Sequence, residues 1–444
     1  MKSAGNFDSR YSCGSRFAWI LAFCILATLR AAGSDFISGA DVSHLVFFED
    51  RGIVYRDAGR VDDALAILRR RGLNCARLRL FTSSAAQARA NPYNATNNLD
   101  YTLPLAVRAR RAGLQVLLDF HYSDSWADPG KQTQPVAWTN LSFAALERQM
   151  YDYNSNTIAA FKAAGAMPEY VQVGNEIIQG LLWPAGKVGG SNDTPAQWEK
   201  LGILLKVAIQ GIRDAAGSPS PRIVIHIDRG GDWAGTQWFF DHLTQQQVAF
   251  DIIGQSYYPW WHGDLSALRK CLTNTAARYA RPIVIAETAF PWTTNGTPVA
   301  GIRPGADGQV QFVIELARIV KNLPGNHGAG IFWWGTEYQA LSGLGLAGFD
   351  SRSFFDRQGN TLPAAGALGA LTAPVQLTAG VTDDALTLQW PFSAAGMVLM
   401  SATNLAPFAT WQPVPAATQS TGLAFSVSLT ARTNHRRFYR LESR

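Results

Sequence analysis

Two kinds of apolar pattern alternate along the chain from residue 36 to about residue 370. Short, nearly continuous apolar runs are typical of strands buried on both faces. Between them lie longer stretches in which apolar positions recur every three to four residues, as on one face of a helix. Regular alternation of strands and helices predicts a parallel sheet in which each helix connects one strand to the next.

Eight strands and several of the helices between them can be placed. Strands are expected at residues 36–42, 75–81, 115–121, 170–175, 222–227, 252–257, 283–287 and 329–334, and helices at residues 61–71, 103–112, 143–164, 198–215 and 309–322. Eight such units fit a closed (β/α)8 TIM barrel better than an open doubly wound sheet, and no Gly-rich dinucleotide fingerprint follows the first strand. The fold class is therefore predicted to be α/β, with a barrel over residues 34–370.

The pattern changes near residues 372–374. Short alternating strands are expected at residues 386–390, 397–401, 424–429 and 438–441, with turn residues between them. This pattern predicts a small C-terminal β-sandwich over residues 374–444, appended to the barrel as an accessory domain.

The N-terminus has the pattern of a secretory signal peptide. Lys2, Arg10 and Arg16 precede an apolar run over residues 17–29, and small residues follow at 31–33. The run is too short to span a bilayer well, since a transmembrane helix needs about 20 apolar residues. We expect cleavage after this segment, secretion to the extracellular space or periplasm, and no stable membrane insertion.

Charge and cysteine content narrow the function classes. The formal charge is +6, and loss of residues 1–33, with four basic groups and one acid, leaves the mature chain at about +3. No Lys/Arg cluster is present, so a nucleic-acid partner is not expected. Cys75 and Cys271 would remain, and we expect two packed thiols, although an oxidising compartment would permit a disulfide.

Two glutamates end apolar strands. Asn175 and Glu176 follow the run 170–174, and Glu287 follows the run 282–286. Barrel enzymes gather their reactive residues at the carboxyl ends of the strands. Glycoside hydrolysis needs one carboxyl group that protonates the leaving oxygen and a second that attacks the sugar or activates water. The two glutamates therefore suggest glycosidase chemistry.

Other strand ends carry polar and aromatic side chains that suit sugar binding. Arg79 is expected to donate to Glu287, because a guanidinium matches a carboxylate, and Asn175 to bind a sugar 2-hydroxyl. Either Tyr257 or Tyr258 is expected to contact Glu287. The remaining candidates for substrate binding are Asp41, His121, His226, Trp292 and Trp334. The alternative for the two histidines is a structural role inside the barrel. Further faces for sugar stacking are offered by Trp126, Trp183, Trp260 and Trp261, and about half of all six tryptophans are expected in the core.

Several motifs, in a fixed order, resemble one known family. They are G-A-D-V-S from Gly39, R-L-R from Arg77, D-F-H-Y-S-D-S-W-A-D-P-G-K-Q from Asp119, Y-D-Y-N from Tyr151, V-Q-V-G-N-E-I from Val171, L-W-P-A-G-K from Leu182, I-G-Q-S-Y-Y-P-W-W from Ile253 and A-E-T-A-F-P-W-T from Ala286. Together they resemble the arabinogalactan endo-β-1,4-galactanases, family 53 of the glycoside hydrolases in clan A.

The resemblance implies a retaining hydrolase of β-1,4-galactan, the galactose side chains of pectin and type I arabinogalactan. By motif, Glu176 takes the acid/base role and Glu287 the nucleophile role. We expect a monomer without a cofactor. Calcium is possible but not supported by the sequence. Some bacterial members bind calcium with an Asp- and Gly-rich loop, where this chain has T-T-N-G-T-P-V-A-G from Thr293. Asp307 alone supplies too few of the roughly six to eight oxygen ligands that a calcium ion needs.

Two alternatives stay open from sequence. Another clan A endo-glycosidase, a β-mannanase or cellulase, would have the same two glutamates and different aromatic residues. A secreted carbohydrate-binding barrel without catalysis would not need Glu176 and Glu287, and both are present.

Overall fold

Eight parallel strands close into a barrel in the computed structural model. The structure describes residues 36–294, 297–382, 385–394, 396–406, 409–416, 418–421, 424–430 and 437–443. Around the barrel the strands follow the order β1-β12-β11-β10-β9-β6-β5-β4, each hydrogen-bonded to the next. Their bounds are β1 Ile37–Asp41, β4 Cys75–Leu80, β5 Gln115–Phe120, β6 Tyr170–Val173, β9 Arg222–Ile227, β10 Ile252–Ser256, β11 Ile283–Thr288 and β12 Gly328–Trp333. The predicted barrel and all eight of its strands are confirmed.

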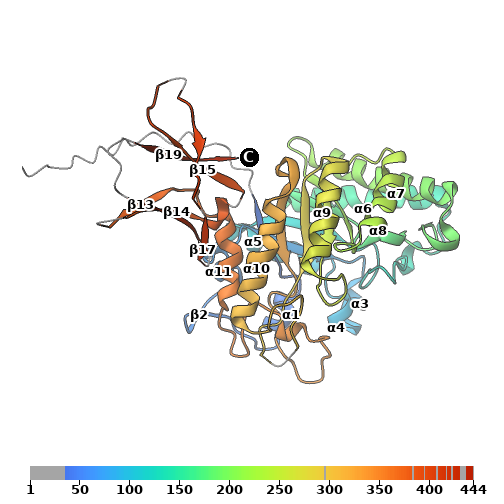
Figure 1. Cartoon of the computed structure of the whole chain (residues 1–444). Coiled ribbons are helices and arrows are strands. Elements are labelled where there is room, and N and C mark those ends of the chain that lie inside the picture. Colours follow the sequence, from blue (N-terminus) through green and yellow to red (C-terminus); the bar gives the residue numbers. More distant parts are fainter. Residues whose placement is uncertain are drawn as a thin grey trace, which may run out of the picture. The chain divides into compact units, whose positions relative to one another are not determined.

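Helices cover the outside of this barrel (Figure 1). They are α1 Leu45–Glu49, α2 Ala64–Arg70, α3 Ala85–Ala90, α4 Pro92–Ala95, α5 Leu99–Arg111, α6 Phe143–Ala163, α7 Pro195–Ala216, α8 Trp233–Gln245, α9 Leu265–Tyr279, α10 Ala306–Lys321 and α11 Pro363–Gly369. The five helices expected from apolar periodicity are present. Short loop strands form two pairs, β2 Arg56–Asp57 with β3 Arg60–Val61, and β7 Gly180–Leu181 with β8 Gly186–Lys187.

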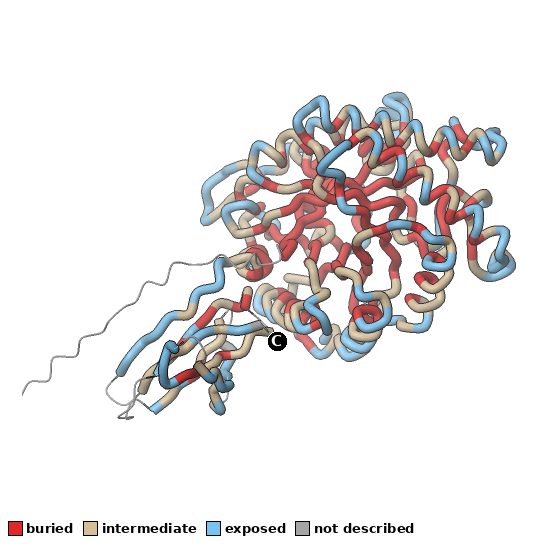
Figure 2. The backbone as a smooth tube through the Cα atoms, turned by 90° about the horizontal axis from the view of Figure 1, so that it is seen from above, coloured by how far each residue is buried: buried red, intermediate tan, exposed pale blue. Residues whose placement is uncertain are grey.

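Local sequence explains where many of the helices begin. The side chains of Asp63, Asn98, Ser142, Thr194 and Asp264 each accept a hydrogen bond from a backbone N–H in the first turn of the helix that follows. Such caps satisfy backbone donors that have no partner within the helix. Buried positions concentrate on the strands and on the inner faces of the helices, while the outer faces are exposed (Figure 2).

The lumen of the barrel has an apolar floor. One buried cluster contains residues from each of the eight strands and none from the helices: Ile37, Cys75, Leu117, Tyr170, Val224, Ile252, Val284, Ala286 and Phe332. Alternation along a strand places the residue two positions later on the same face. Polar side chains such as Arg77, Asp119, Gln172 and His226 therefore follow directly above this floor. Gly39 has no room for a side chain there, because a Cβ would meet the Phe332 ring at 2.1 Å.

Two small antiparallel sheets follow the barrel in sequence. The first has the order β13-β14-β18-β17 and the second β16-β15-β19. Their strands are β13 Thr378–Val381, β14 Ala385–Pro391, β15 Met397–Ala402, β16 Gln412–Pro413, β17 Gln419–Thr421, β18 Ala424–Thr430 and β19 Phe438–Ser443. The four expected strands are present, and β13, β16 and β17 are additional. That these sheets form a separate β-sandwich domain stays a prediction.

Two further expectations concern cysteines and the membrane. Cys75 and Cys271 are both free and buried, so they do not form a disulfide. Among the described residues, no helix combines the length and apolar character needed to cross a bilayer. The predicted signal peptide lies outside the described residues.

Candidate active site

Glu176 stands just beyond the end of β6 in an unusual backbone conformation. Its φ and ψ are 50° and 49°, in the left-handed region, and it precedes a short 3-10 turn at Ile177–Gln179. A residue other than glycine in this region costs on the order of 1–3 kcal/mol, and such strain is common at functional sites. Gly174, with φ of 87°, allows the chain to leave the strand in this direction.

Glu287 enters the lumen through an irregularity in β11. Val284 and Ala286 both belong to the apolar floor, so strict alternation would turn Glu287 outward. The register between β10 and β11 shifts at this point, where Gln255 pairs with Ile285 but Ser256 pairs with Glu287. An extra residue of this kind re-aims the side chain that follows it.

The cation that holds Glu287 is Arg77, not Arg79 as expected. Arg77 is fully buried, and its Nη2 donates to Glu287 Oε1 at 2.8 Å. The same guanidinium binds Asp41 Oδ2 at 2.7 Å and lies 2.8 Å from Asp119 Oδ2. Arg77 and Arg79 share one face of β4, because they are two residues apart, but Arg77 lies one layer deeper. Strand alternation could have identified both arginines as residues that face the lumen. How deep each one lies in the lumen depends on the register of the barrel strands.

Arg79 instead lies against the indole ring of Trp126. Its guanidinium carbon is 4.0 Å from the ring centre of Trp126, and Nη2 lies 2.9 Å from His44 Nδ1. Its nearest carboxylate is Asp41, at 4.0 Å. This position lets Arg79 line the cavity without touching Glu287.

Of the two tyrosines, Tyr258 contacts the carboxylate. Its hydroxyl donates to Glu287 Oε2 at 2.9 Å. The Tyr257 hydroxyl donates to the Gly263 carbonyl, and its ring packs near Phe312. Tyr258 follows Ser256 by two residues and so faces the lumen, while Tyr257 faces away. Tyr257 is therefore not placed at the site.

Glu176 is held by a chain of polar groups that runs into the barrel. Its Oε1 lies 2.6 Å from Ser256 Oγ, which in turn lies 2.9 Å from His226 Nε2. His226 Nδ1 lies 3.1 Å from Asn175 Oδ1. Ser256 was not among the expected site residues. It could have been found from the sequence, because it is a polar residue at the carboxyl end of the apolar run that forms β10.

Both carboxyl groups have altered proton affinities. Burial raises the pKa of Glu176 well above its usual range, and the charges of Glu287 and Asp228 raise it further. Burial also raises the pKa of Glu287, where Arg77 acts in the opposite direction. Because Arg77 and Tyr258 both favour an ionised Glu287, these contacts favour binding of a proton to Glu176 over binding to Glu287.

The other expected polar residues are buried near the carboxyl pair. Asp41 accepts from Ser43 and from Arg77, so its oxygens are occupied by protein donors. His121 Nε2 lies 3.0 Å from Asp119 Oδ2, and its Nδ1 accepts from the Ala127 amide. His121 lines the cavity, whereas Asp41 lies behind it.

A cavity of about 300 Å³ opens over both glutamates. Three tryptophans line it, namely Trp126, Trp261 and Trp334, and Trp261 is 64% exposed. Flat apolar faces beside carboxylates and amides are the surroundings that a pyranose ring requires. Trp183, Trp260 and Trp292 are not among the lining residues of this cavity, so the structure does not bring Trp292 to the site.

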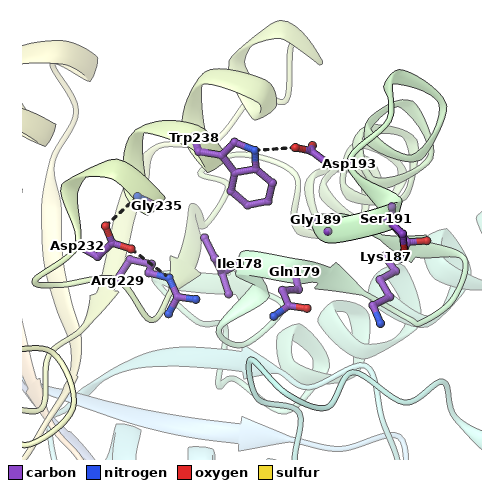
Figure 3. A pocket seen from close by; sticks show the side chains of 12 residues that line it. Ile178, Gln179, Lys187, Gly189, Ser191, Asp193, Arg229, Asp232, Gly235 and Trp238 are labelled. Atoms are coloured by element: carbon purple, nitrogen blue, oxygen red, sulfur yellow. Dashed lines mark hydrogen bonds and ion pairs between the residues drawn. The ribbon is translucent and has the colours of Figure 1, made fainter.

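Two further cavities continue from the Glu176 side. One of about 410 Å³ shares Asp128, Glu176 and Trp261 with the first cavity. The next, of about 550 Å³, shares Arg229 with the second. Figure 3 shows this third cavity, where the Trp238 indole donates to Asp193 and Gln179 lies below. Through these shared lining residues the three cavities form a row that leads away from Glu287.

One group of side chains in the described part of the chain is close enough to hold a metal ion. Glu176, His226 and Glu287 each offer an atom within 4.8 Å of the others. Both nitrogens of His226 already contact protein groups, Asn175 and Ser256, so the arrangement suits proton sharing rather than cation binding. The loop expected to bear on calcium includes residues 295 and 296, which lie outside the described residues.

Comparison with known proteins places this chain in one family. The model of Glycosyl hydrolase family 53 matches residues 37–368. A probable arabinogalactan endo-β-1,4-galactanase A of Aspergillus terreus is 35% identical over 340 residues, covering 73% of this chain and 92% of that protein. The arabinogalactan endo-β-1,4-galactanase of Thermothelomyces thermophilus is 33% identical, covering 73% and 96%.

Solved structures agree with the sequence matches. A fungal β-1,4-galactanase structure superposes with a TM-score of 0.66 at 32% identity, over 74% of this chain and 98% of that one. The family 53 catalytic domain of Ignisphaera aggregans gives a TM-score of 0.69 at 32% identity, over 78% and 98%. With an eight-stranded barrel and two glutamates at its mouth, the chain belongs to glycosyl hydrolase family 53 and is a glycoside hydrolase.

Proposed function

We propose that this protein is a retaining endo-β-1,4-galactanase that acts on the galactan chains of pectin and type I arabinogalactan. The observation that carries the mechanism is the close approach of the two glutamates, because one carboxylate oxygen of Glu176 and one of Glu287 lie within 4.8 Å of each other. Retaining glycosidases separate their carboxyl groups by about 5–5.5 Å, whereas inverting enzymes need about 6.5–9.5 Å to admit a water molecule.

In the first step Glu287 attacks the anomeric carbon. Arg77 and Tyr258 each bind one oxygen of Glu287 and keep it ionised and oriented. Glu176, with its raised pKa, gives its proton to the oxygen of the departing sugar. The bond from the anomeric carbon to the leaving oxygen breaks as the bond to Glu287 forms.

In the second step water releases the sugar. Esterification removes the negative charge of Glu287, so Glu176 loses a nearby charge that raised its pKa and can now act as a base. Glu176 takes a proton from water as the water oxygen attacks the anomeric carbon from the side that the leaving group occupied. The bond from the anomeric carbon to Glu287 breaks at the same time, which returns Glu287 as a carboxylate. Two inversions retain the β-configuration.

The substrate assignment rests on the relatives named as galactanases, since a barrel with paired glutamates also serves other clan A enzymes. Purified protein assayed on potato galactan, mannan and carboxymethyl cellulose tests it. Release of short galactose oligomers from galactan alone is the expected result. Preferential cleavage of mannan or carboxymethyl cellulose would instead support a β-mannanase or cellulase, and no cleavage of any polymer would favour a binding barrel.

We expect the first product to carry a β-anomeric reducing end. Proton NMR during the first minutes of hydrolysis separates the α and β signals before the ring opens and equilibrates. An initial α signal would mean inversion and would contradict the double-displacement mechanism.

The path of cavities predicts where the departing chain lies. If the reacting ring occupies the cavity above Glu287, the leaving portion extends past Glu176 towards Trp238. Trp238→Ala should lower kcat/KM several-fold on polymeric galactan, because loss of one aromatic stacking face costs about 0.5–1.5 kcal/mol. The rate on galactobiose should be nearly unchanged, because only a longer chain reaches the cavity that Trp238 lines. Trp411→Ala, far from these cavities in sequence and outside their linings, is the control. Equal losses on long and short substrates would contradict this direction.

The secreted location also belongs to the proposal, because a galactan-degrading enzyme meets its polymer outside the cell. N-terminal sequencing of the exported protein checks cleavage near residue 33.

A further inference from the structure

The contacts behind Glu176 constrain where hydrogens can lie. The Ser256 hydroxyl has two close neighbours, Glu176 Oε1 at 2.6 Å and His226 Nε2 at 2.9 Å. A hydroxyl carries one hydrogen, so it donates to one of these neighbours and accepts from the other. The charge states of Glu176 and His226 therefore depend on which neighbour receives the hydrogen.

The amide of Asn175 fixes one end of this chain. Arg77 Nη2 donates to Asn175 Oδ1 at 2.9 Å, and Asn175 Nδ2 donates to the Ala127 carbonyl at 2.9 Å. A guanidinium cannot accept a hydrogen bond and a carbonyl cannot donate one, so the amide has a single possible orientation. Asn175 Oδ1 is an acceptor, and His226 Nδ1, which faces it at 3.1 Å, must carry a hydrogen.

The surroundings of His226 favour the neutral form of its ring. Burial lowers its pKa well below 6.5, and the charge of Arg77 lowers it further. Asp119 acts in the opposite direction, but its carboxylate already binds Arg77 and His121. The charged and titratable groups around His226 are Arg77 from β4, Asp119 and His121 from β5, Glu176 after β6, His262 after β10, Glu287 from β11, and Asp228 next to its own strand.

A neutral ring with a hydrogen on Nδ1 has a lone pair on Nε2. The Ser256 hydroxyl then donates to His226 and can only accept from Glu176. We propose that Ser256 and His226 are positioning residues that hold the catalytic proton on Glu176 Oε1 in the resting enzyme, with Glu176 donating to Ser256 and Ser256 donating to His226. This inference rests on the proposed role of Glu176 as the general acid.

The opposite arrangement is less stable for a physical reason. If Ser256 donated to an ionised Glu176, His226 would need a hydrogen on Nε2 as well as Nδ1 and would become a buried cation near Arg77. The carboxylate would also face Glu287 in the same cavity. Moving the proton from Glu176 to His226 thus creates two charges, each beside a charge of its own sign. The raised pKa of Glu176 agrees with the arrangement that keeps both groups neutral.

The direct test is the tautomer of His226 in the substrate-free wild-type enzyme. Nitrogen-15 NMR of histidine-labelled protein distinguishes Nδ1–H, Nε2–H and doubly protonated rings, and His226→Gln assigns the signal. We expect neutral Nδ1–H for His226 near neutral pH. His121 is the internal control, because its Nδ1 accepts from the Ala127 amide and its hydrogen must lie on Nε2. An Nε2–H or doubly protonated His226 would overturn the proposal.

The kinetic test uses Ser256→Ala. Loss of the hydroxyl that accepts from the protonated acid should move the alkaline limb of kcat/KM to lower pH by about half a unit to one unit, the worth of one hydrogen bond. If Ser256 donated to an ionised Glu176, the same substitution would move that limb to higher pH. A rise or no shift would therefore refute the proposal, and Ser256→Thr, which keeps the hydroxyl, should restore the wild-type profile.

The two tests separate this inference from the proposed function. Should the enzyme fail to hydrolyse galactan, the substrate assignment is wrong, while the His226 tautomer is still measured without substrate. Should galactan be cleaved and His226 carry its hydrogen on Nε2, the function stands and the positioning role of Ser256 and His226 does not.

Discussion

Replacing Glu176 or Glu287 with glutamine is expected to remove nearly all hydrolysis of galactan while the barrel stays folded. Loss of general acid catalysis alone lowers the rate about 100- to 10,000-fold, and loss of the nucleophile closes the covalent route. Initial rates on polymeric galactan, with circular dichroism as a check of folding, measure the effect.

The two variants should differ on a substrate with an activated leaving group, such as a nitrophenyl galactooligosaccharide. Such a group departs without a proton, so Glu176→Gln should still show a rapid first release, and Glu287→Gln should not. The matched control is Glu337→Gln, because Glu337 is also fully buried near this end of the barrel but accepts from the His44 amide and does not contact Glu176 or Glu287. Near-normal rates for both active-site variants would refute the assignment.

The second large effect is expected from Arg77→Met, which leaves Asp41, Asp119 and Glu287 without their shared cation. Breaking a buried ion pair by removing one partner typically costs about 3–5 kcal/mol of unfolding free energy. Because Arg77 lowers the pKa of Glu287, its loss should raise that pKa and move the acidic limb of kcat/KM to higher pH. Urea denaturation and a pH–rate profile measure the two effects.

Arg79→Met is the matched control for that prediction. Arg79 is buried on the same strand face, but its nearest carboxylate lies 4.0 Å away and it does not touch Glu287. Its replacement should remove the support of the Trp126 ring and so weaken substrate binding. The acidic limb of the kcat/KM profile should stay in place. If Arg79→Met shifted this limb as much as Arg77→Met, Arg77 would not be the residue that sets the proton affinity of Glu287.

Much of this molecule could be predicted from local sequence. Apolar runs gave the eight strands, and polar caps mark helix starts, because both depend on neighbouring residues along the chain. The two glutamates were visible for the same reason, since each directly follows a strand. The family motifs added an expected chemistry and substrate that periodicity alone does not contain.

The contacts within the site were decided by tertiary structure. Arg77 and Arg79 occupy equivalent positions in the R-L-R pattern, yet only the stagger of the closed barrel places Arg77 beside Glu287. The choice of Tyr258 over Tyr257 follows from which face of β10 turns into the lumen. Glu287 itself reaches the site through a register shift that strict alternation would not anticipate.

The hydrogen-bonded row from Glu176 through Ser256 to His226 also combines features that the sequence predicts with contacts that only the tertiary structure decides. Each residue lies at or just beyond the carboxyl-terminal part of a different strand, and the three are separated by 50 and 30 positions in sequence. Sequence alone determined that polar groups would meet at the carboxyl end of the barrel, because parallel strands of one sheet end at the same edge. Only the closed structure decided which atoms come within hydrogen-bonding distance, because depth and direction depend on strand stagger, a bulge in β11 and the left-handed backbone at Glu176.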